Sequence, residues 1–351
     1  MKWTLPLGKS MVRKSVFIYN IKIGGFLMKK NTKTLLLSLF TAIAVVLLAA
    51  CGANKQANSK TTNSSSASSE VTVKTANGDV KVPTNPKKIV TLDLGAADTI
   101  RALGKESSIV GMPKKTLPTY LKNLPSSIKN VGSMKEPNME AIAALKPDLI
   151  IASGRTAQYV KKLKEIAPTV LFQTDNKDYW GSTKKNILSL ASIFGEDGTK
   201  KAKSELATLD KEIQTVVAAN EKSNKNALAM MLNEGAISAF GAKSRFAFLY
   251  STLKFKPTDA KIKESRHGQE VSFESIKQIN PDIIFVLNRT LAIGGDNSAN
   301  KDLLNNSLIQ ETNAAKNKTI VNLTSDLWYL SGGGLESTKL MIEDVKNVAG
   351  K

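Results

Sequence analysis

The sequence has very few residues that bind metals through nitrogen or sulfur, with one cysteine and one histidine among 351 residues. One cysteine excludes a disulfide within the chain and any cysteine-rich metal cluster, and one histidine excludes sites built from several imidazoles. A protein that binds bare metal ions directly is therefore disfavoured. The chain is 42% hydrophobic, which is enough for the core of one large or two medium domains.

Acidic side chains are missing from the first fifty residues, which carry eight lysines and arginines. The formal net charge of the chain is +20, from 50 basic and 30 acidic side chains, and without this segment it falls to +12. The remaining lysines are spread along the sequence, so the composition predicts no nucleic-acid partner.

The segment that begins at Met28 reads MKKNTKTLLLSLFTAIAVVLLAAC, with three lysines, sixteen mostly apolar residues (35–50) and then Cys51. This is the layout of an export signal, and the apolar run is shorter than the roughly 20 residues that span a membrane. The sequence LAAC at 48–51 resembles the bacterial lipoprotein signal, which implies a lipid on Cys51 and removal of the peptide before it. An uncleaved anchor that ends in a cysteine is the alternative.

Residues 1–27 do not fit a signal, because Pro6, Gly8 and the Arg13–Lys14 pair interrupt any apolar run, and Met28 is the expected initiator. We therefore exclude 1–50 from the fold. Residues 51–70 are rich in serine, asparagine and threonine, which predicts a flexible tether. The expected location is the extracellular face of a cell membrane, with the protein anchored through its lipid.

Apolar runs alternate with helical patterns after Pro86, which predicts a parallel sheet flanked by helices. A small hairpin with a turn at Asn77–Gly78 is expected before it. The strand candidates are 89–94, 109–110, 149–152 and 170–172, and the helices between them include 96–103 and 156–166. The fold class is α/β.

Residues 182–223 contain no proline and have apolar residues near helical spacing. A break at Gly195–Gly198 is expected to divide them into two helices, of which the second would be roughly 36 Å long at about 1.5 Å per residue. Two interpretations are open, a plain surface helix or a strut that joins two lobes.

An internal repeat favours the strut. Residues 140–155 (EAIAALKPDLIIASGR) align without gaps with 274–289 (ESIKQINPDIIFVLNR), and six of the sixteen positions are identical. Each copy predicts a short helix, a Pro-Asp turn and a buried strand. We therefore expect two similar α/β lobes, at 71–196 and 224–351, joined by a linking helix at 197–223, with the ligand cleft between them.

Arginines follow the repeated strands, at Arg155 and Arg289. Ligands of open α/β sheets bind at the carboxyl ends of the strands, so each lobe is expected to present a guanidinium to an anionic, oxygen-rich ligand. A third arginine, Arg245, follows a glycine turn early in the second lobe. The triple glycine 332–334 lacks the Lys-Ser/Thr of a phosphate-binding loop.

Six segments resemble the substrate-binding lipoproteins of ABC importers for ferric siderophores, most of all those for catecholate siderophores such as petrobactin. The segments are GSMKEP (132–137), KPDLIIASGR (146–155), ISAFGAKSRF (237–246), HGQ (267–269), NPDIIFVLNR (280–289) and WYLSGGGLES (328–337). The resemblance covers the chain from about Val71 to its end. It implies two lobes bridged by one long helix, and a protein that captures a ferric catecholate and delivers it to an ABC permease without catalysis.

The resemblance also implies roles for single residues. Arg155, Arg245 and Arg289 match three arginines around the catecholate oxygens, and Lys135 matches a lysine that adds positive charge. His267 and Tyr329 match a pair that fills the iron positions left open by four-oxygen siderophores, and Trp328 adjoins that site. Glu140 and Glu274 match acidic residues that dock the lobes onto the permease, although the helix dipole alone also favours a glutamate in a first turn.

Other functions remain as alternatives. Haem or another ferric siderophore could bind through His267 or Tyr329 of the same fold. An exported hydrolase with His267 as its base is disfavoured, because no Gly-x-Ser-x-Gly motif or other nucleophile motif accompanies the histidine. We expect no resident cofactor, a monomer, and an ABC permease as the partner. The residues do not identify the preferred siderophore.

Overall fold

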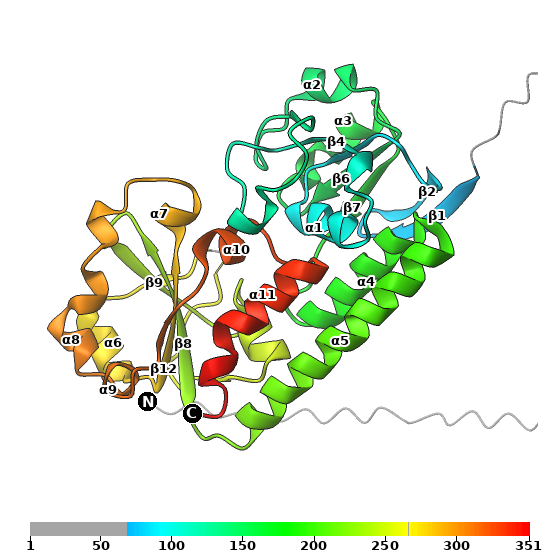
Figure 1. Cartoon of the computed structure of the whole chain (residues 1–351). Helices are drawn as coiled ribbons and strands as arrows, with labels where there is room; N and C mark the ends of the chain where they lie inside the picture. Colours follow the sequence, from blue (N-terminus) through cyan, green and yellow to red (C-terminus); the bar gives the residue numbers. More distant parts are fainter. Residues whose placement is uncertain (1–68, 266) are drawn as a thin grey trace, which may run out of the picture. The chain divides into compact units, whose positions relative to one another are not determined.

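The computed structural model describes residues 69–265 and 267–351 (Figure 1). The predicted export signal, the lipidation of Cys51 and nearly all of the predicted tether lie outside the described residues. Within the described ranges, none of the helices combines the length and the apolar character that a membrane span needs.

The predicted hairpin is present as β1 (Glu70–Thr75) and β2 (Gly78–Pro83), which pair in antiparallel fashion. Gly78 has a φ of +96°, which favours glycine in the turn. The Asn77 side chain binds the backbone of Thr169 and Leu171, so the hairpin is fastened to the first sheet at its edge strand.

The first lobe is a five-stranded parallel sheet in the order β5-β4-β3-β6-β7. Its strands are β3 (Ile89–Thr91), β4 (Ile109–Met112), β5 (Lys129–Asn130), β6 (Leu149–Ser153) and β7 (Thr169–Phe172). Its helices are α1 (Leu94–Ala102), α2 (Met139–Ala144), α3 (Val160–Lys164) and α4 (Tyr179–Ser192). The strand predicted over 89–94 ends early, because the Asp93 side chain accepts a hydrogen bond from the Ala96 N–H and caps α1.

The second lobe has the strand order β11-β9-β8-β12-β13, in which β8, β12 and β13 are parallel and β9 is antiparallel to β8 and β11. Its strands are β8 (Asn226–Asn233), β9 (Ala236–Phe240), β10 (Lys256–Pro257), β11 (Gln269–Glu270), β12 (Ile283–Asn288) and β13 (Ile320–Asn322). Its helices are α6 (Phe273–Ile279), α7 (Arg289–Ala292), α8 (Ser307–Gln310), α9 (Asn313–Lys316), α10 (Ser325–Leu330) and α11 (Leu335–Val345). The α/β fold class with two lobes is thus confirmed.

Helix α5 (Gly195–Glu221) is the expected long helix, and it packs against α4 and α11 (Figure 1). The predicted break at Gly195–Gly198 is wrong in position, since the chain leaves the helical path at Ile193–Phe194 and Gly198 lies inside α5. A Cβ on Gly198 would come within 2.7 Å of the Ala191 carbonyl oxygen. This glycine therefore allows the close approach of α5 to α4, and it does not end a helix.

Buried strands of both lobes have apolar residues on both faces, as expected for parallel sheets covered by helices. In the first lobe, Ile89 and Ile151 face a core that also includes α1, α4 and α5. Val90 and Ile150 face the opposite core, beneath α2 and α3. The core shared with α5 also includes residues of β8 and β12, so it continues from one lobe into the other.

The repeat is reproduced in detail at the backbone. Asn138 and Ser272 cap α2 and α6, each accepting a hydrogen bond from the N–H three residues later. Lys146 and Asn280, at the ends of these helices, both have a φ of +48°. Left-handed backbone at a matched non-glycine position indicates that the two helix-turn-strand units have the same local structure.

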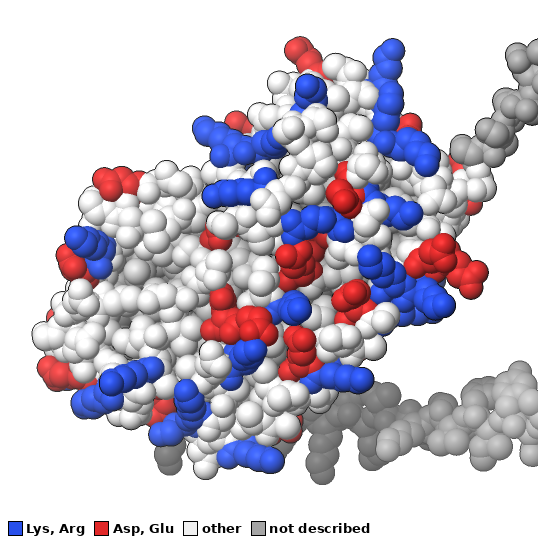
Figure 2. All heavy atoms as spheres, in the orientation of Figure 1, with Lys and Arg blue, Asp and Glu red and all other residues white. Residues whose placement is uncertain are grey.

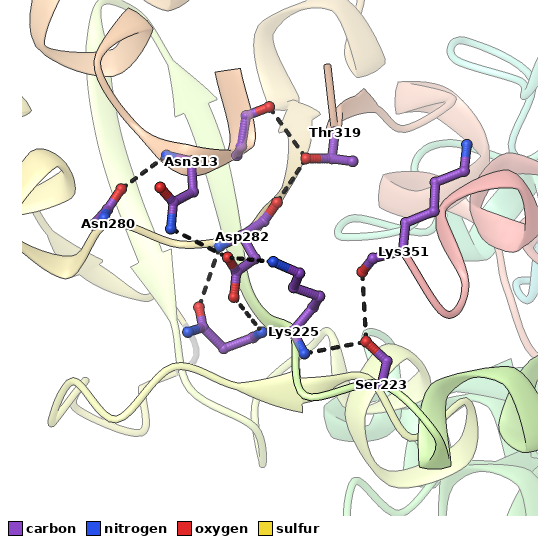
Figure 3. Close-up of polar contacts among 9 residues, drawn as sticks. Ser223, Lys225, Asn280, Asp282, Asn313, Thr319 and Lys351 are labelled. Atoms are coloured by element: carbon purple, nitrogen blue, oxygen red, sulfur yellow. Dashed lines mark hydrogen bonds and ion pairs between the residues drawn. The ribbon is translucent and has the colours of Figure 1, made fainter. Parts of the chain in front are cut away.

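The aspartate of each Pro-Asp turn holds the start of a neighbouring strand. Asp148 Oδ2 accepts hydrogen bonds of 2.9 Å from the N–H groups of Lys87 and Lys88, which precede β3. Asp282 Oδ2 accepts one of 3.1 Å from the N–H of Asn226, the first residue of β8. Figure 3 shows the second network, in which Lys225 and Asn313 also approach the Asp282 carboxylate. The aspartates are therefore structural in both lobes.

Candidate siderophore site

Tyr329, on α10, is surrounded by three guanidinium groups. The Cζ atoms of Arg245, Arg155 and Arg289 lie 4.5, 5.3 and 5.6 Å from the centre of its ring. These arginines come from three segments of the chain: Arg155 follows β6, Arg245 follows the turn after β9, and Arg289 begins α7. Because cations over an aromatic face are attracted by its quadrupole, the ring helps to hold three like charges together.

Arg155 and Arg289 donate hydrogen bonds to oxygen atoms of the site, and Arg245 donates one to the Met231 sulfur at 3.9 Å. Arg289 Nε donates to the phenolic oxygen of Tyr329 at 2.9 Å, and its Nη1 donates to Asn233 Oδ1. Arg155 Nη2 donates to the backbone carbonyl of Tyr329 at 2.7 Å. Arg155 is in the first lobe and Tyr329 is in the second, so this bond joins the lobes at the site.

The phenol of Tyr329 is partly buried, and burial alone would raise its pKa. The hydrogen bond from Arg289 and the charges of Arg289, Arg245 and Arg155 together outweigh burial, so the pKa of Tyr329 is below its usual value. The three arginines therefore favour the phenolate, which is the form of tyrosine that binds ferric iron.

A cavity of about 690 Å³ opens beside this cluster. Four of the predicted site residues line it, namely Arg155, Arg245, Trp328 and Tyr329. Both lobes contribute. Asp93, Gly154 and Gln173 come from the first lobe, where they directly follow or lie close behind β3, β6 and β7, and Arg245 and Tyr329 come from the second. The cavity thus lies at the carboxyl ends of the first sheet, where ligands of α/β folds bind.

The other three predicted residues are outside the cavity wall. Arg289 is connected to the site by its hydrogen bond to the phenolic oxygen of Tyr329. Lys135 is exposed, and its neighbour Met134 lines the cavity. His267 is also exposed, and its backbone N–H donates to the hydroxyl of Ser265, a residue of the cavity wall. The described residues contain no group of three or more histidine, cysteine or acidic side chains that could hold a metal ion.

Trp328 is almost fully buried against the cavity and donates from its indole nitrogen to Asp344 Oδ2 at 2.8 Å. Its ring centre lies 6.1 Å from that of Phe248. These contacts hold the indole in one position, which makes Trp328 a fixed reporter of the cavity.

The triple glycine packs the lobes together. A Cβ on Gly95, at the start of α1, would come within 2.3 Å of the Gly332 carbonyl oxygen, and one on Gly334 would come within 2.3 Å of Asp98 Oδ2. Gly332 and Gly333 both have positive φ angles. The glycines are therefore required by close backbone approach between α1 and the loop before α11.

Several cavity residues were missed by the sequence reasoning, among them Asp93, Tyr179, Lys243 and Glu264. Asp93 could have been found, because it follows strand β3 as Arg155 follows β6. Burial raises its pKa to about 6, although hydrogen bonds from Ala96 and Gly95 and the charge of Arg155 act in the opposite direction. Glu264 lies on an irregular loop, where no periodicity points to the cavity.

Glu140 and Glu274 are exposed in the first turns of α2 and α6, so they occupy equivalent positions on the two lobes. The pKa of Glu274 is lowered by hydrogen bonds from its own backbone N–H and from the Ser272 hydroxyl. Both carboxylates are accessible to a partner.

Residues 89–327 match the sequence profile of the family described as periplasmic binding protein. This match covers more than half of the chain. The chain belongs to the periplasmic binding protein family. Its resemblance to the siderophore-binding members of ABC importers is confirmed by the relatives described below.

This periplasmic binding protein is 42% identical over 322 residues to the petrobactin-binding protein YclQ of Bacillus subtilis, with 91% of this chain and 98% of YclQ covered. It is 33% identical to the ferric-anguibactin-binding protein FatB of Vibrio anguillarum, over 76% of this chain and 84% of FatB. Among solved structures it is similar to the iron uptake ABC transporter substrate-binding protein PiuA of Streptococcus pneumoniae, with 70% identity, a TM-score of 0.77, and coverage of 79% of this chain and 97% of PiuA.

Proposed function

We propose that this protein captures a ferric catecholate-type siderophore, similar to petrobactin, in the cavity between its lobes and delivers it to an ABC permease for iron uptake. The observation that carries the proposal is the group of three arginines around Tyr329 beside a cavity of about 690 Å³. The names of the relatives, a petrobactin-binding and a ferric-anguibactin-binding protein, support the same class of ligand.

The charge of the ligand matches the charge of the site. A ferric tris-catecholate carries a charge of about −3, which Arg155, Arg245 and Arg289 can offset where water is partly excluded. Planar guanidinium groups also stack on catechol rings and donate to their oxygens. Lys135, beside the cavity wall, adds a further positive charge on an exposed side chain that can turn toward a bound ligand.

A siderophore that supplies four oxygens leaves two positions of ferric iron open. Tyr329, with its lowered pKa, is the candidate for one position, and His267 is the candidate for the other. Ferric iron is a hard cation that favours oxygen, so a phenolate with one imidazole is a suitable supplement. In this proposal the iron is cargo, the protein has no resident cofactor, and it performs no catalysis.

The proposed partners are the permease and a membrane. Glu140 and Glu274 would each bind the permease through one lobe, and Cys51 would carry the lipid that anchors the protein at the outer face of a cell membrane. Figure 2 shows Lys, Arg, Asp and Glu interspersed over the visible face, with no single basic patch that would suit a nucleic acid. The protein is proposed to act as a monomer.

Tryptophan fluorescence tests the proposal. The protein without residues 1–51 retains two of its three tryptophans, Trp180 and Trp328, and only Trp328 lines the cavity. A dark ferric catecholate bound there should quench Trp328. The protein is titrated with ferric petrobactin, ferric bis-catecholates, a ferric hydroxamate and haemin.

Quenching by catecholates at submicromolar concentration, weakened at least tenfold by Arg155→Ala or Arg289→Ala, is the expected result, since a lost charge-assisted hydrogen bond costs about 1.5 kcal/mol or more. A response only to haemin or to the hydroxamate would overturn the catecholate assignment. The matched control is Lys161→Ala, which removes an exposed positive charge on α3 away from the cavity wall.

A further inference from the structure

Asn233 lies where it can hold Arg289 against Tyr329. Its side-chain oxygen accepts a hydrogen bond from Arg289 Nη1, while Arg289 Nε donates to the phenolic oxygen of Tyr329 at 2.9 Å. Arg289 is outside the cavity wall, and 23% of its side chain is exposed. A long side chain with access to solvent has many conformations open to it, so a second acceptor helps to keep the guanidinium at the phenol.

The backbone brings Asn233 and Arg289 together. Strands β8 and β12 are parallel neighbours, and Leu232 of β8 is the partner of Asn288 of β12. Asn233 and Arg289 each come one residue after this pair, at the carboxyl ends of the two strands. The contact therefore joins two side chains from adjacent positions of one sheet.

The turn that connects β8 with β9 is fastened to α7. The N–H of Glu234, in this turn, donates to Thr290 Oγ1 at 3.0 Å, and the N–H of Gly235 donates to Asn300 Oδ1 at 2.8 Å. Asn300 is buried, and its Nδ2 donates to Thr290 Oγ1 at 3.0 Å. These bonds keep the end of β8 and the start of α7 at a fixed separation.

The acceptor for Arg289 Nη1 is a neutral amide. A carboxylate in its place would bind the guanidinium more strongly, but it would also offset the positive charge. The acid that approaches Arg289 is Glu234, with 3.9 Å between Oε1 and Nη1, and 74% of the Glu234 side chain is exposed. Water screens such a pair, so it offsets little of the charge. The guanidinium is thus held in place and still acts as a cation.

We propose that Asn233 is a positioning residue of the siderophore site. It directs Arg289 onto Tyr329 through an acceptor that leaves the guanidinium charge available to an anionic ferric ligand. Groups that orient the ligands of a metal change its affinity without touching the metal. The inference rests on the proposed function, because it assumes that a ferric catecholate is bound at Tyr329.

A double-mutant cycle tests whether Asn233 acts through Arg289. Dissociation constants of a ferric bis-catecholate are measured by Trp328 quenching. Asn233→Ala should weaken binding about fivefold, because one hydrogen bond no longer holds Arg289. In the Arg289→Ala background, the same substitution should change the dissociation constant by less than about twofold. An equal weakening in both backgrounds would mean that Asn233 serves the fold alone, which overturns the inference.

The visible charge-transfer band of the bound ferric bis-catecholate gives a second readout, which a purely structural role of Asn233 would not move. Asn233→Ala should shift the band in the same direction as Arg289→Ala, since both weaken the hydrogen bond to the phenolic oxygen. In the Tyr329→Phe background, Asn233→Ala should leave the band in place. A band that Asn233→Ala does not shift in the otherwise wild-type protein overturns the inference.

Asn233→Asp separates position from charge and keeps the shape of the side chain. Its carboxylate would hold Arg289 in place but offset the charge, so the affinity for the ferric bis-catecholate should fall about tenfold. Wild-type affinity in this variant would overturn the role of a neutral acceptor. If no ferric catecholate quenches Trp328 in the wild type, the proposed function itself fails, which is distinct from a failure of the cycle.

Asn224→Asp is the matched control, because it changes the net charge equally near the other end of β8. Asn224 is exposed, lies outside the cavity wall, and accepts a hydrogen bond from Lys256 Nζ at 3.0 Å. Its substitution should leave the affinity within about twofold of the wild type, since exposed charges far from the site are screened. An equal loss of affinity in Asn224→Asp would assign the effect of Asn233→Asp to net charge and overturn the inference.

Discussion

Arg289 donates a hydrogen bond from Nε to the phenolic oxygen of Tyr329 at 2.9 Å, while its Cζ lies 5.6 Å from the centre of the same ring. One guanidinium thus acts on both the oxygen and the ring of a tyrosine. Arg155 and Arg245 add their charges, and together they lower the pKa of Tyr329 in spite of its partial burial. The phenolate that this arrangement favours is a hard oxygen ligand.

Substitution of Tyr329 by phenylalanine should alter the iron site only for ligands that leave iron positions open. With a ferric bis-catecholate, we expect Tyr329→Phe to change the visible charge-transfer spectrum and to weaken binding about tenfold, because a phenolate ligand is lost. With a ferric tris-catecholate, whose six oxygens fill the iron shell, the spectrum should not change. Identical bis-catecholate spectra for wild type and variant would contradict direct coordination by Tyr329.

The general fold was predictable because its signals are local and repeated. The 140–155 and 274–289 segments share six residues, and the structure gives both copies a capped helix, a left-handed residue and a Pro-Asp turn. Arg155 and Arg289 could be placed by the rule that ligands bind at the carboxyl ends of strands. Arg245 was noted as a third arginine after a glycine turn, but its place beside Tyr329 in the site came only from the resemblance to a family.

Features that depend on distant contacts could not be predicted. Glu264 reaches the cavity because its loop packs on Gly241, and no periodic pattern marks that contact. In the sequence, Asp98 looks like an ordinary polar residue of a helix. Its hydrogen-bond donors, the N–H groups of Glu336 and Ser337, are 238 and 239 residues away along the chain. The predicted position of the α4–α5 break was wrong, because Gly198 allows two helices to pack closely. In the sequence, such a glycine cannot be distinguished from a glycine in a turn.

Asp98 joins the two lobes and should make the stability of the protein depend on pH. Its oxygens accept hydrogen bonds from the N–H groups of Glu336 and Ser337 at 2.9 and 2.7 Å, in the first turn of α11. Burial outweighs these bonds and raises the pKa of Asp98 to about 6. Between about pH 4 and pH 6 the folded state therefore holds a proton that the unfolded state has released, so stability falls as the pH rises.

The free energy of unfolding of the wild type, minus that of Asp98→Asn, should fall by about 2 kcal/mol between pH 4 and pH 6, out of about 3 kcal/mol for the whole titration, and stay level above pH 7, since the pKa is raised by about two units. Urea denaturation at a series of pH values gives this difference. A difference that rises with pH would show that the hydrogen bonds at α11 outweigh burial, contrary to the expectation.

Gly95→Ala should weaken the contact between α1 and the glycine loop. Alanine is favoured over glycine in a helix by up to about 1 kcal/mol, but the added Cβ would meet the Gly332 carbonyl oxygen at 2.3 Å, and backbone cannot move as easily as a side chain. We expect the steric effect to prevail and to lower the free energy of unfolding by about 1–3 kcal/mol. Thermal and urea unfolding measure it.

Gly154→Ala is the control, because Gly154 also lines the cavity but its Cβ would meet only the Gln173 side chain, at 3.4 Å or more. It should change stability by less than about 0.5 kcal/mol. If Gly95→Ala were as stable as Gly154→Ala, the lobes would have to tolerate a shift at this junction.

Charge reversal at Glu140 and Glu274 should separate ligand capture from delivery. Both carboxylates are exposed in first helical turns at equivalent positions of the two lobes, and neither lines the cavity. The double variant Glu140→Arg with Glu274→Arg should bind the ferric siderophore with an affinity within about twofold of the wild type, because the substituted side chains are outside the cavity wall. Uptake of labelled iron by cells that depend on this protein should fall at least tenfold. The family resemblance implies that these glutamates bind arginines of the permease, and like charges across an interface are strongly unfavourable.

The helix dipole also affects the stability of the double variant. In the first turn of any helix, an arginine is less favourable than a glutamate by about 0.3–1 kcal/mol. Glu196→Arg controls for that loss, since Glu196 is an exposed glutamate in the first turn of α5. It should lower stability by a similar amount and leave uptake intact. Normal uptake by the double variant would contradict docking through these glutamates, and a loss of uptake in Glu196→Arg would assign the effect to helix stability.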